Sequence, residues 1–301
     1  MSKLKNIMVI MNPSSGLSDS GKFKEKIEEQ LSKYFEEVRI EETQRKGHAC
    51  ELSKEASEKR FDSICSVGGD GTLSEVLTGL LDQEYVPKIL IFPSGTGNIM
   101  SKILKYNQNR DKVIDSINFD EAIPVDIGRV GNKAFGFILS LGVVPDALNE
   151  VSNEDKEKFG FMAYVANLLK NINTQKEYNL EVHVDNFVYR GKVDYLAATM
   201  SNKFSVIKIP GVDSSLNDGN INVFILKDAA FLSRAKMGID FIAGDITKSE
   251  NIEFMQGKKL TIKSLDDQEI YIDLDGDKGL KLPVEVEVIS GKYRIYVPKK
   301  Y

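Results

Sequence analysis

One stretch of the chain, residues 61–81, constrains the fold more than any other. It begins with an apolar run, Phe61–Val67, whose length is typical of a buried strand, and three of the next four residues are glycines. The apolar residues of Thr72–Leu81 then recur with the spacing of a helix. The stretch therefore predicts a strand, a glycine turn and a helix in direct succession.

The glycine turn, residues 68–72, has the composition of a phosphate-binding loop. Glycines let backbone N–H groups approach phosphate oxygens, and the N-terminus of the following helix carries a partial positive charge in the same space. Asp70 is the only charged residue in the turn; it would repel a bare phosphate but can bind the Mg²⁺ that accompanies a nucleotide. The alternative is that Asp70 caps its own helix through the N–H group of Thr72 or Leu73, since aspartate is a favoured N-cap.

Strand and helix patterns alternate four times in the first half of the chain. The expected strands are Ile7–Met11, Val38–Ile40, Phe61–Val67 and Lys88–Phe92, and the expected helices are Lys22–Phe35, Ala49–Lys59, Thr72–Leu81 and Ile99–Leu104. Short, continuous apolar strands between helices are typical of a mostly parallel sheet covered by helices on both faces. Ligands bind beyond the carboxyl ends of such strands, where Asn12, Thr43 and a second glycine turn, Pro93–Asn98, also lie.

From Arg129 onward most segments have the pattern of strands. They are Ala134–Leu141, Asn179–Val184, Phe187–Val193, Tyr195–Ser201, Ile221–Leu226, Lys259–Ser264, Glu269–Leu274, Val284–Val288 and Tyr293–Val297. Turn residues such as Asp185-Asn186 separate several of them, and two helical patches, Phe161–Lys170 and Phe231–Ala243, interrupt the series. The second half is therefore expected to be an antiparallel β-sandwich.

The length of the chain, 301 residues, exceeds what one hydrophobic core usually supports, so two domains are expected. The predicted fold class is α/β plus all-β. We expect residues 1–124 to form a three-layer α/β nucleotide-binding domain with a mostly parallel sheet, and residues 125–291 to form an antiparallel β-sandwich. The pattern leaves open whether a last strand, residues 292–301, returns to the first domain.

Composition excludes several other functions. The net charge of −5 argues against broad nucleic-acid binding, which needs a basic surface. No apolar run reaches the length of a membrane span and no signal peptide is visible, so we expect a cytoplasmic protein without a transmembrane segment. Cys50 and Cys65 lack metal-ligand spacing and are expected to be reduced, and two histidines, His48 and His183, are too few for a His-rich metal site.

Taken in order, the motifs resemble the bacterial diacylglycerol kinase and lipid kinase family, whose catalytic domain is related to that of sphingosine and ceramide kinases. The residues that carry the resemblance are Asn12-Pro13 with Gly16, Thr43 with Gly47-His48-Ala49, Gly68-Gly69-Asp70-Gly71-Thr72 followed by Glu75, Pro93 with Gly95-Thr96-Gly97-Asn98, Val125-Asp126-Ile127-Gly128, Asp218-Gly219 and Asp275-Gly276-Asp277. The resemblance covers essentially the whole chain. It implies transfer of the γ-phosphoryl group of ATP to a lipid hydroxyl in a cleft between the two domains. ATP and Mg²⁺ are the implied cofactors, and the implied substrate is a lipid at the membrane surface, which the protein contacts transiently.

The resemblance also implies a role for individual residues. The implied nucleotide-binding residues are Asn12, Thr43, Gly68, Gly69, Gly71, Thr72, Glu75, Gly95, Thr96 and Asn98, with Asp70 near the magnesium. Glu75 could reach the ribose or a basic neighbour, or be an ordinary carboxylate in the first turn of its helix. Asp126 is implied in an aspartate and water network that leads to a structural magnesium bound by Ser215, Asp218 and Asn220. Asp218 is also an ordinary residue for a hairpin turn.

The implied general base is Asp277, which follows the Asp-Gly pair at 275 and 276. A carboxylate within hydrogen-bond reach can take the proton that the acceptor hydroxyl loses as it attacks. The family usually has Glu at this position, so the carboxylate is one methylene shorter here, and catalysis is sensitive to shifts of about 1 Å. The alternative is a plain β-turn, for which Asp-Gly is a favoured pair.

Ile99 is a second departure from the family pattern. Diacylglycerol kinases commonly carry Asp directly after the Gly-Thr-x-Asn turn, whereas sphingosine-type members have an apolar or small residue there. Diacylglycerol, giving phosphatidic acid, is the expected acceptor, and another lipid such as a sphingoid base remains an alternative. A soluble acceptor such as NAD is a further alternative, because NAD kinases share the Gly-Gly-Asp-Gly turn, although their Gly-Ser/Thr-Thr-Ala-Tyr segment has no match here. A non-catalytic lipid or nucleotide sensor, and a homodimer, also stay open.

Overall fold

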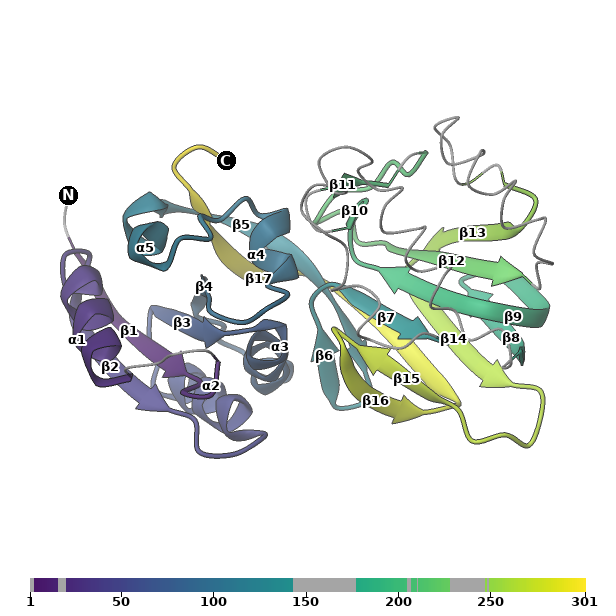
Figure 1. Cartoon of the computed structure of the whole chain (residues 1–301), viewed down its shortest axis with the longest axis horizontal. Helices are drawn as coiled ribbons and strands as arrows, with labels where there is room; N and C mark the ends of the chain where they lie inside the picture. Colours follow the sequence, from purple (N-terminus) through teal and green to yellow (C-terminus); the bar gives the residue numbers. More distant parts are fainter. Residues whose placement is uncertain are drawn as a thin grey trace. The chain divides into compact units, whose positions relative to one another are not determined.

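The computed structural model describes residues 3–15, 20–142, 177–204, 207–209, 211–227, 247 and 249–301 (Figure 1). The chain divides into two compact units: the first contains Met1–Ile127, Asn132–Gly136 and Ser290–Tyr301, and the second contains Gly128–Gly131 and Phe137–Ile289. Gly16 and the two predicted helical patches, Phe161–Lys170 and Phe231–Ala243, lie outside the described residues.

The first unit is built from alternating strands and helices. Its elements are β1 (Leu4–Met11), α1 (Ser20–Leu31), β2 (Phe35–Glu42), α2 (His48–Glu58), β3 (Ser63–Gly68), α3 (Asp70–Gly79), β4 (Lys88–Pro93), α4 (Ile99–Ile103), the 3-10 helix η1 (Arg110–Lys112), α5 (Val113–Ser116), β5 (Ile117–Val130), which runs on into the second unit, and β6 (Lys133–Phe135). α2 packs against α3, and α1 packs against α5.

The sheet of the first unit has the strand order β17-β4-β3-β1-β2, and these neighbours are parallel. The residues from Ile7 to Met11 are fully buried, as are Ile64, Cys65 and Val67. Strands buried on both faces need continuous apolar runs, which explains the sequence pattern. The predicted α/β architecture with a mostly parallel sheet is confirmed.

The first helix ends earlier than its apolar spacing predicts. It was expected to reach Phe35, but α1 ends at Leu31 and Phe35 begins β2. The Phe35 side chain is fully buried and meets the ring of Phe119 edge-to-face, with the centroids 5.4 Å apart. Packing in the core therefore overrides a helical spacing that happened to continue for one more turn.

The regular elements described in the second unit are mostly antiparallel strands. They are β7 (Ile138–Leu141), β8 (Tyr178–Val184), β9 (Phe187–Thr199), β10 (Lys203–Phe204), β11 (Ile207–Lys208), β12 (Ile221–Lys227), β13 (Ile252–Gly257), β14 (Lys259–Ser264), β15 (Tyr271–Leu274), β16 (Asp277–Lys281) and β17 (Val284–Pro298), whose end belongs to the first unit. The main strand order is β16-β15-β7-β9-β8-β14-β17, and β12 pairs with both β9 and β13. The predicted antiparallel β-domain is confirmed.

Some strand boundaries were predicted wrongly. The expected strand Ala134–Leu141 is divided between β6 and β7, which belong to different units. In the opposite direction, the two strands expected around Asp194 form one strand, β9, in which Asp194 is only 4% exposed. β17 likewise joins two expected strands. Gly291 lies between them with a φ of +73°, a conformation that is irregular for a strand and that glycine adopts without steric cost.

β17 contributes to both units along its length. Its first residues pair with β14, where Lys259 faces Glu287, and Ile295 pairs with Ile89 of β4. The later part is in the core of the first unit, because Tyr293, Ile295, Tyr296 and Val297 are fully buried. No helix among the described residues is long and apolar enough to cross a membrane.

Candidate active site

The turn after β3 brings the first group of predicted residues together. β3 ends at Gly68 and α3 begins at Asp70. A Cβ added to Gly68 would lie 2.3 Å from Thr72 Oγ1, so only glycine fits there. The same Oγ1 accepts a hydrogen bond from Asn12 Nδ2 at 3.3 Å, and Asn12 N donates to the carbonyl oxygen of Val67 at 2.9 Å. Asn12 and the glycine turn are therefore direct neighbours.

The second glycine turn, after β4, is closed by its own asparagine. Asn98 lies in the left-handed region with φ of +49°; its Oδ1 accepts from Gly95 N at 3.0 Å, and its Nδ2 donates to Gly95 O at 2.7 Å. Thr96 is exposed at the tip of this turn. The side chain of Asn98 thus closes the turn through both of its polar atoms.

The two glycine turns touch through their backbones. Ser94 N donates to the carbonyl oxygen of Gly68 at 3.0 Å. A Cβ added to Gly95 would lie 2.5 Å from the Cα atom of Gly69. The contact has room for no side chain, so a larger residue at position 95 would push the turns apart.

Asp70 links the same two turns with its carboxylate. Its Oδ1 accepts from Ile99 N at 2.8 Å, and a Cβ added to Gly97 would lie 2.6 Å from its Oδ2. Asp70 therefore caps α4, whereas α3 has Gly69 at its N-cap and no side-chain cap, so the alternative in which Asp70 caps its own helix through Thr72 or Leu73 is not formed. Burial raises the pKa of the Asp70 carboxyl, and the N–H groups at the start of α4 lower it by a smaller effect.

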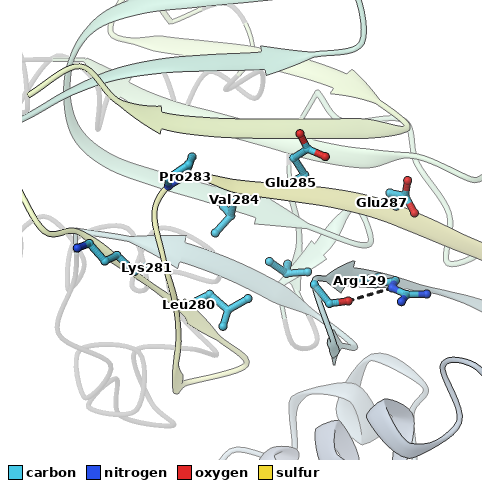
Figure 2. A pocket seen from close by; sticks show the side chains of 9 residues that line it. Arg129, Leu280, Lys281, Pro283, Val284, Glu285 and Glu287 are labelled. Atoms are coloured by element: carbon cyan, nitrogen blue, oxygen red, sulfur yellow. Dashed lines mark hydrogen bonds between the residues drawn. The ribbon is translucent and has the colours of Figure 1, made fainter.

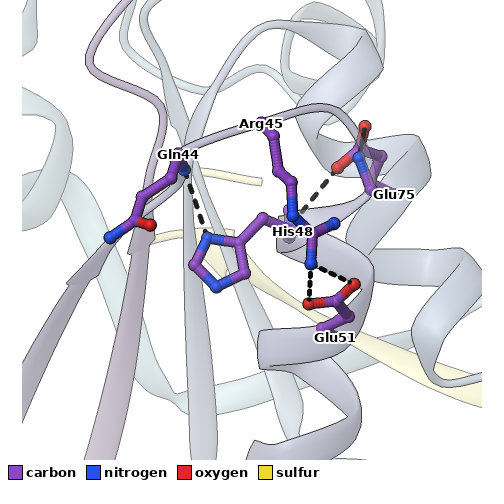
Figure 3. A network of polar contacts seen from close by, with 7 residues as sticks. Gln44, Arg45, His48, Glu51 and Glu75 are labelled. Atoms are coloured by element: carbon purple, nitrogen blue, oxygen red, sulfur yellow. Dashed lines mark hydrogen bonds and ion pairs between the residues drawn. The ribbon is translucent and has the colours of Figure 1, made fainter.

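Glu75 lies on α3, one turn beyond the glycine turn, and binds backbone rather than a basic side chain. Its Oε1 accepts from Gly47 N at 2.8 Å and its Oε2 accepts from Ala49 N at 3.3 Å. Figure 3 shows this contact beside a second pair, in which Arg45 binds both carboxylate oxygens of Glu51 at 2.8 Å.

The segment before α2 also contains Thr43, another predicted nucleotide contact. Thr43 N donates to the carbonyl oxygen of Met11 at 2.8 Å, which ties the end of β2 to the end of β1. His48 Nδ1 accepts from Gln44 N at 3.1 Å (Figure 3).

Asp126 is buried on β5 with 1% of its surface exposed.

The Asp-Gly pair of the second unit forms a two-residue hairpin turn. Asp275 and Gly276 have φ of +51° and +90°, and Leu274 pairs with Asp277 across the turn. The β-turn that the Asp-Gly pair favours is present, and Asp277 is exposed at the first position of β16. Burial raises the pKa of the Asp273 carboxyl, and the nearby charge of Asp277 raises it further.

Asp275 anchors this hairpin, a role that we did not predict. Its Oδ1 accepts from Phe137 N at 3.0 Å and from Ile138 N at 2.9 Å, and its own N–H group donates to Ile138 O at 2.9 Å. The sequence signal that could have indicated it is the Asp-Gly pair itself, because aspartate tolerates the left-handed conformation and can bind backbone N–H groups from there.

The three residues predicted to hold a structural magnesium lie together in one turn. Asp218 Oδ2 accepts from Ser215 N at 2.8 Å, its Oδ1 accepts from Asn220 N at 2.9 Å, and Asn220 Nδ2 donates to Asp218 O at 3.2 Å. All three hydrogen bonds join residues within the turn itself. In the part of the chain that the structure describes, no group of three or more His, Cys, Asp or Glu residues is placed to hold a metal ion.

A pocket of about 670 Å³ lies in the second unit (Figure 2). It is lined by Arg129, Val130, Gly131, Leu280, Lys281, Pro283, Val284, Glu285 and Glu287. Arg129 Nε donates to Gly131 O at 3.0 Å at one side of it. None of the predicted site residues lines this pocket, although Leu280 and Lys281 belong to the same strand as Asp277.

The first unit is a parallel α/β unit whose two glycine turns abut at the carboxyl ends of its strands, and the second unit contains antiparallel strands. The family model for the diacylglycerol kinase catalytic domain matches residues 6–130, and that for the YegS C-terminal NAD kinase beta sandwich-like domain matches residues 139–297. The chain belongs to the diacylglycerol kinase-like lipid kinase family, whose enzymes are phosphotransferases with an alcohol acceptor. The resemblance inferred from the motifs is thereby confirmed.

Individual relatives cover nearly the whole chain. A protein of Streptococcus pneumoniae named "Putative lipid kinase" is 36% identical over 99% of both chains. The protein of Bacillus subtilis named "Diacylglycerol kinase" is 26% identical and covers 99% of this chain and 98% of its own. A crystal structure titled as a diacylglycerol kinase from Bacillus anthracis has a TM-score of 0.77 at 21% identity, covering 100% of this chain and 99% of that one, which supports the fold.

Proposed function

We propose that this protein transfers the γ-phosphoryl group of ATP to the hydroxyl of a lipid, with diacylglycerol as the acceptor and phosphatidic acid as the product. The observation that supports this most is the contact between Gly69 and Gly95, which keeps side chains out of the space where two turns present their backbones. Phosphoryl transfer needs little covalent work from a protein, so that positioning and charge neutralisation by N–H groups and a metal supply most of the catalysis.

The residues of the first unit fit a nucleotide phosphate chain. Gly68 and Gly97 are also positions where an added Cβ would meet a neighbouring side chain. We propose that the backbone at the two turns binds the phosphates, with Asn12 and Thr72 beside them. A magnesium ion, when bound, would neutralise phosphate charge, and it needs few protein ligands because phosphate oxygens and water supply the others. Asp70 is the carboxylate proposed nearest to it.

In the second unit we propose Asp277 as the group that takes the proton of the attacking hydroxyl. Its exposure at the start of β16 makes it accessible to a substrate. Asp275 holds the hairpin by its two hydrogen bonds to the start of β7. Asp218, with Ser215 and Asn220, remains the proposed structural magnesium site, and Asp126 the proposed link toward it; oxygen donors suit that ion.

The acceptor is tested by incubating the protein with labelled ATP and Mg²⁺ against four acceptors: diacylglycerol, a sphingoid base, a total lipid extract and NAD. We expect labelled phosphatidic acid, identified by mass spectrometry. Labelled NAD phosphate without any labelled lipid would overturn the proposal. Binding of ATP without turnover on any lipid would instead support the sensor alternative.

A sphingoid-type acceptor is the second candidate, and Ile99 favours it. The family members that use diacylglycerol commonly carry Asp at this position, whereas here the residue is apolar and its N–H group binds Asp70. In the same assay, labelling of the sphingoid base in preference to diacylglycerol would select this candidate.

A further inference from the structure

The carboxylate of Glu75 spans two helices that start at different loops of the predicted nucleotide site. It lies on α3, which begins at the glycine turn, and it binds the N-terminus of α2. Gly47 is the N-cap of α2 and has no side chain, so it cannot satisfy the free N–H groups of the first turn. Glu75 supplies the missing acceptor from the neighbouring helix.

The segment 43–47 is consequently fixed at both ends. At its start, Thr43 N donates to Met11 O, next to Asn12. At its end, Gly47 N donates to Glu75 Oε1 (Figure 3), and Gly47 holds the left-handed conformation with φ of +85° that makes this approach of the chain possible. Since Glu75 and the glycine turn belong to one helix, this contact sets the distance between the segment and the turn.

We propose that Glu75 is a positioning residue, which holds the segment 43–47 against the glycine turn of α3 and does not bind the nucleotide ribose. The inference rests on the proposed nucleotide site. Both carboxylate oxygens already accept backbone N–H groups, so Gly47 and Ala49 fix the position of the carboxylate, and a ribose hydroxyl would have to share an oxygen that is already bonded.

Amide hydrogen exchange without nucleotide tests the structural half of this proposal. In Glu75→Gln one acceptor becomes an NH₂ donor that faces a backbone N–H group. We therefore expect the amide that loses its acceptor, Gly47 or Ala49, to exchange about 10- to 100-fold faster than in the wild type, the range that corresponds to losing a hydrogen bond to a charged group. The matched control is Glu51→Gln, which removes the Arg45 ion pair of the same segment and should leave both amides unchanged. Unchanged exchange in Glu75→Gln would overturn the proposal.

If Glu75→Gln does not fold, the wild type itself decides: the amides of Gly47 and Ala49 must be protected from exchange, and rapid exchange at both would overturn the proposal. No kinase activity is needed for either measurement, so these results stand even if the proposed reaction is absent.

Nucleotide affinity tests the functional half. We expect Glu75→Gln to weaken binding of ATP, 2′-deoxy-ATP and 3′-deoxy-ATP by one common factor of about 10, because a displaced loop affects all three alike. If Glu75 bound the ribose, the substitution would weaken ATP more than the deoxy analogue that lacks the bonded hydroxyl, and that result would overturn the proposal. A wild type that binds none of the three would refute the nucleotide site itself, while the exchange result would still report on the segment.

Discussion

Two glycines that meet across the candidate site, Gly69 and Gly95, differ in how much space a Cβ atom would have at each position. A Cβ on Gly95 would lie 2.5 Å from the Gly69 Cα atom, whereas a Cβ on Gly69 would lie 3.3 Å from the Gly95 Cα atom. The first distance cannot be relieved by a side-chain movement, because the Cβ atom is fixed by its own backbone and the atom that it meets belongs to the backbone of Gly69. The second needs a shift of only a few tenths of an ångström.

We therefore expect Gly95→Ala to lower the free energy of unfolding by about 1–3 kcal/mol, as for other overpacked sites, and to abolish measurable ATP binding. Gly69→Ala is the matched control and should lose less in both measurements. Denaturant unfolding and calorimetric ATP titration of the two variants check this. Equal losses would show that the close approach does not matter.

Two aspartates of the hairpin at 275–277 have separate expected roles, Asp275 in stability and Asp277 in proton transfer, and substitutions can test each role by itself. Asp275→Asn keeps an acceptor for Phe137 N and Ile138 N and tolerates positive φ, so its unfolding free energy should stay close to that of the wild type, while Asp275→Ala should lose about 1–3 kcal/mol. Asp277→Ala, at an exposed position, should change stability by no more than about 0.5 kcal/mol.

If Asp277 takes the substrate proton, Asp277→Ala should also reduce kcat by about 10²- to 10⁴-fold without a matching change in ATP affinity. Steady-state kinetics on the lipid acceptor provide the measurement. Full activity in Asp277→Ala together with an inactive, folded Asp275→Asn would transfer the role of base to Asp275.

At the scale of elements, α4 is a helix of five residues, Ile99–Ile103, too short to be stable by itself. Asn98 at its N-cap makes no side-chain cap, and the acceptor for Ile99 N comes from Asp70 on another helix. Asp70→Asn retains an oxygen acceptor of the same length. We expect this variant to keep its fold and lose turnover, if the charge of Asp70 is required near magnesium.

The difference in unfolding free energy between the wild type and Asp70→Asn should depend on pH in a defined direction. Burial raises the pKa of Asp70 above its ordinary value of 3.8, so the folded state binds a proton more tightly than the unfolded chain. The stability that this proton contributes is fully present below 3.8 and is lost as the pH rises through the folded-state pKa. Unfolding free energies measured from about pH 3 to about pH 7 should therefore fall for the wild type relative to Asp70→Asn. A constant difference would contradict the raised pKa.

The sequence predicted those elements whose signal is local. The strand, glycine turn and helix around residues 68–72 follow from composition and spacing, and the structure places them within two or three residues. β9 and β17 were each expected as two strands, because Asp194 and Gly291 interrupt the pattern of apolar residues along the sequence. Their continuity depends on neighbouring strands, which a linear pattern does not contain.

The sequence also did not predict which distant backbone groups the polar side chains bind. The motif resemblance named Asp70 and Glu75 as part of the site, but not their attachment to the N-termini of α4 and α2. Those contacts join residues 26 to 29 positions apart, and only the packing of α3 beside both loops brings them together. Spacing within one helix could not indicate them.

At the scale of the whole molecule, the first unit is made from three separate parts of the chain. Its last part supplies Tyr293, Ile295 and Tyr296, all fully buried, and Tyr296 Oη lies 2.8 Å from Ser63 Oγ at the start of β3. Fully burying one large apolar side chain contributes about 1.5–3 kcal/mol, and the stability of a whole domain is only about 5–15 kcal/mol. Losing these three side chains would therefore remove about 4.5–9 kcal/mol, which is comparable to the whole stability of the unit.

We therefore expect a fragment of residues 1–136 to be unfolded or aggregated. The same fragment joined by a flexible glycine-serine linker to residues 290–301 should unfold cooperatively, as measured by circular dichroism on heating. A fragment of residues 1–136 that melts cooperatively at the same temperature as the linked protein would show that β17 is dispensable.

The late position of β17 in the chain has a consequence for synthesis in the cell. A ribosome adds about 5–20 residues per second, and residues 137–289 separate β6 from the segment that completes the first unit. The parallel strands must therefore wait on the order of ten seconds, with the edge of β4 unpaired, before Ile295 can dock beside Ile89. A nascent chain that is released before residues 290–301 are made lacks the last part of the first unit, so we expect that unit to stay unfolded in the released fragment.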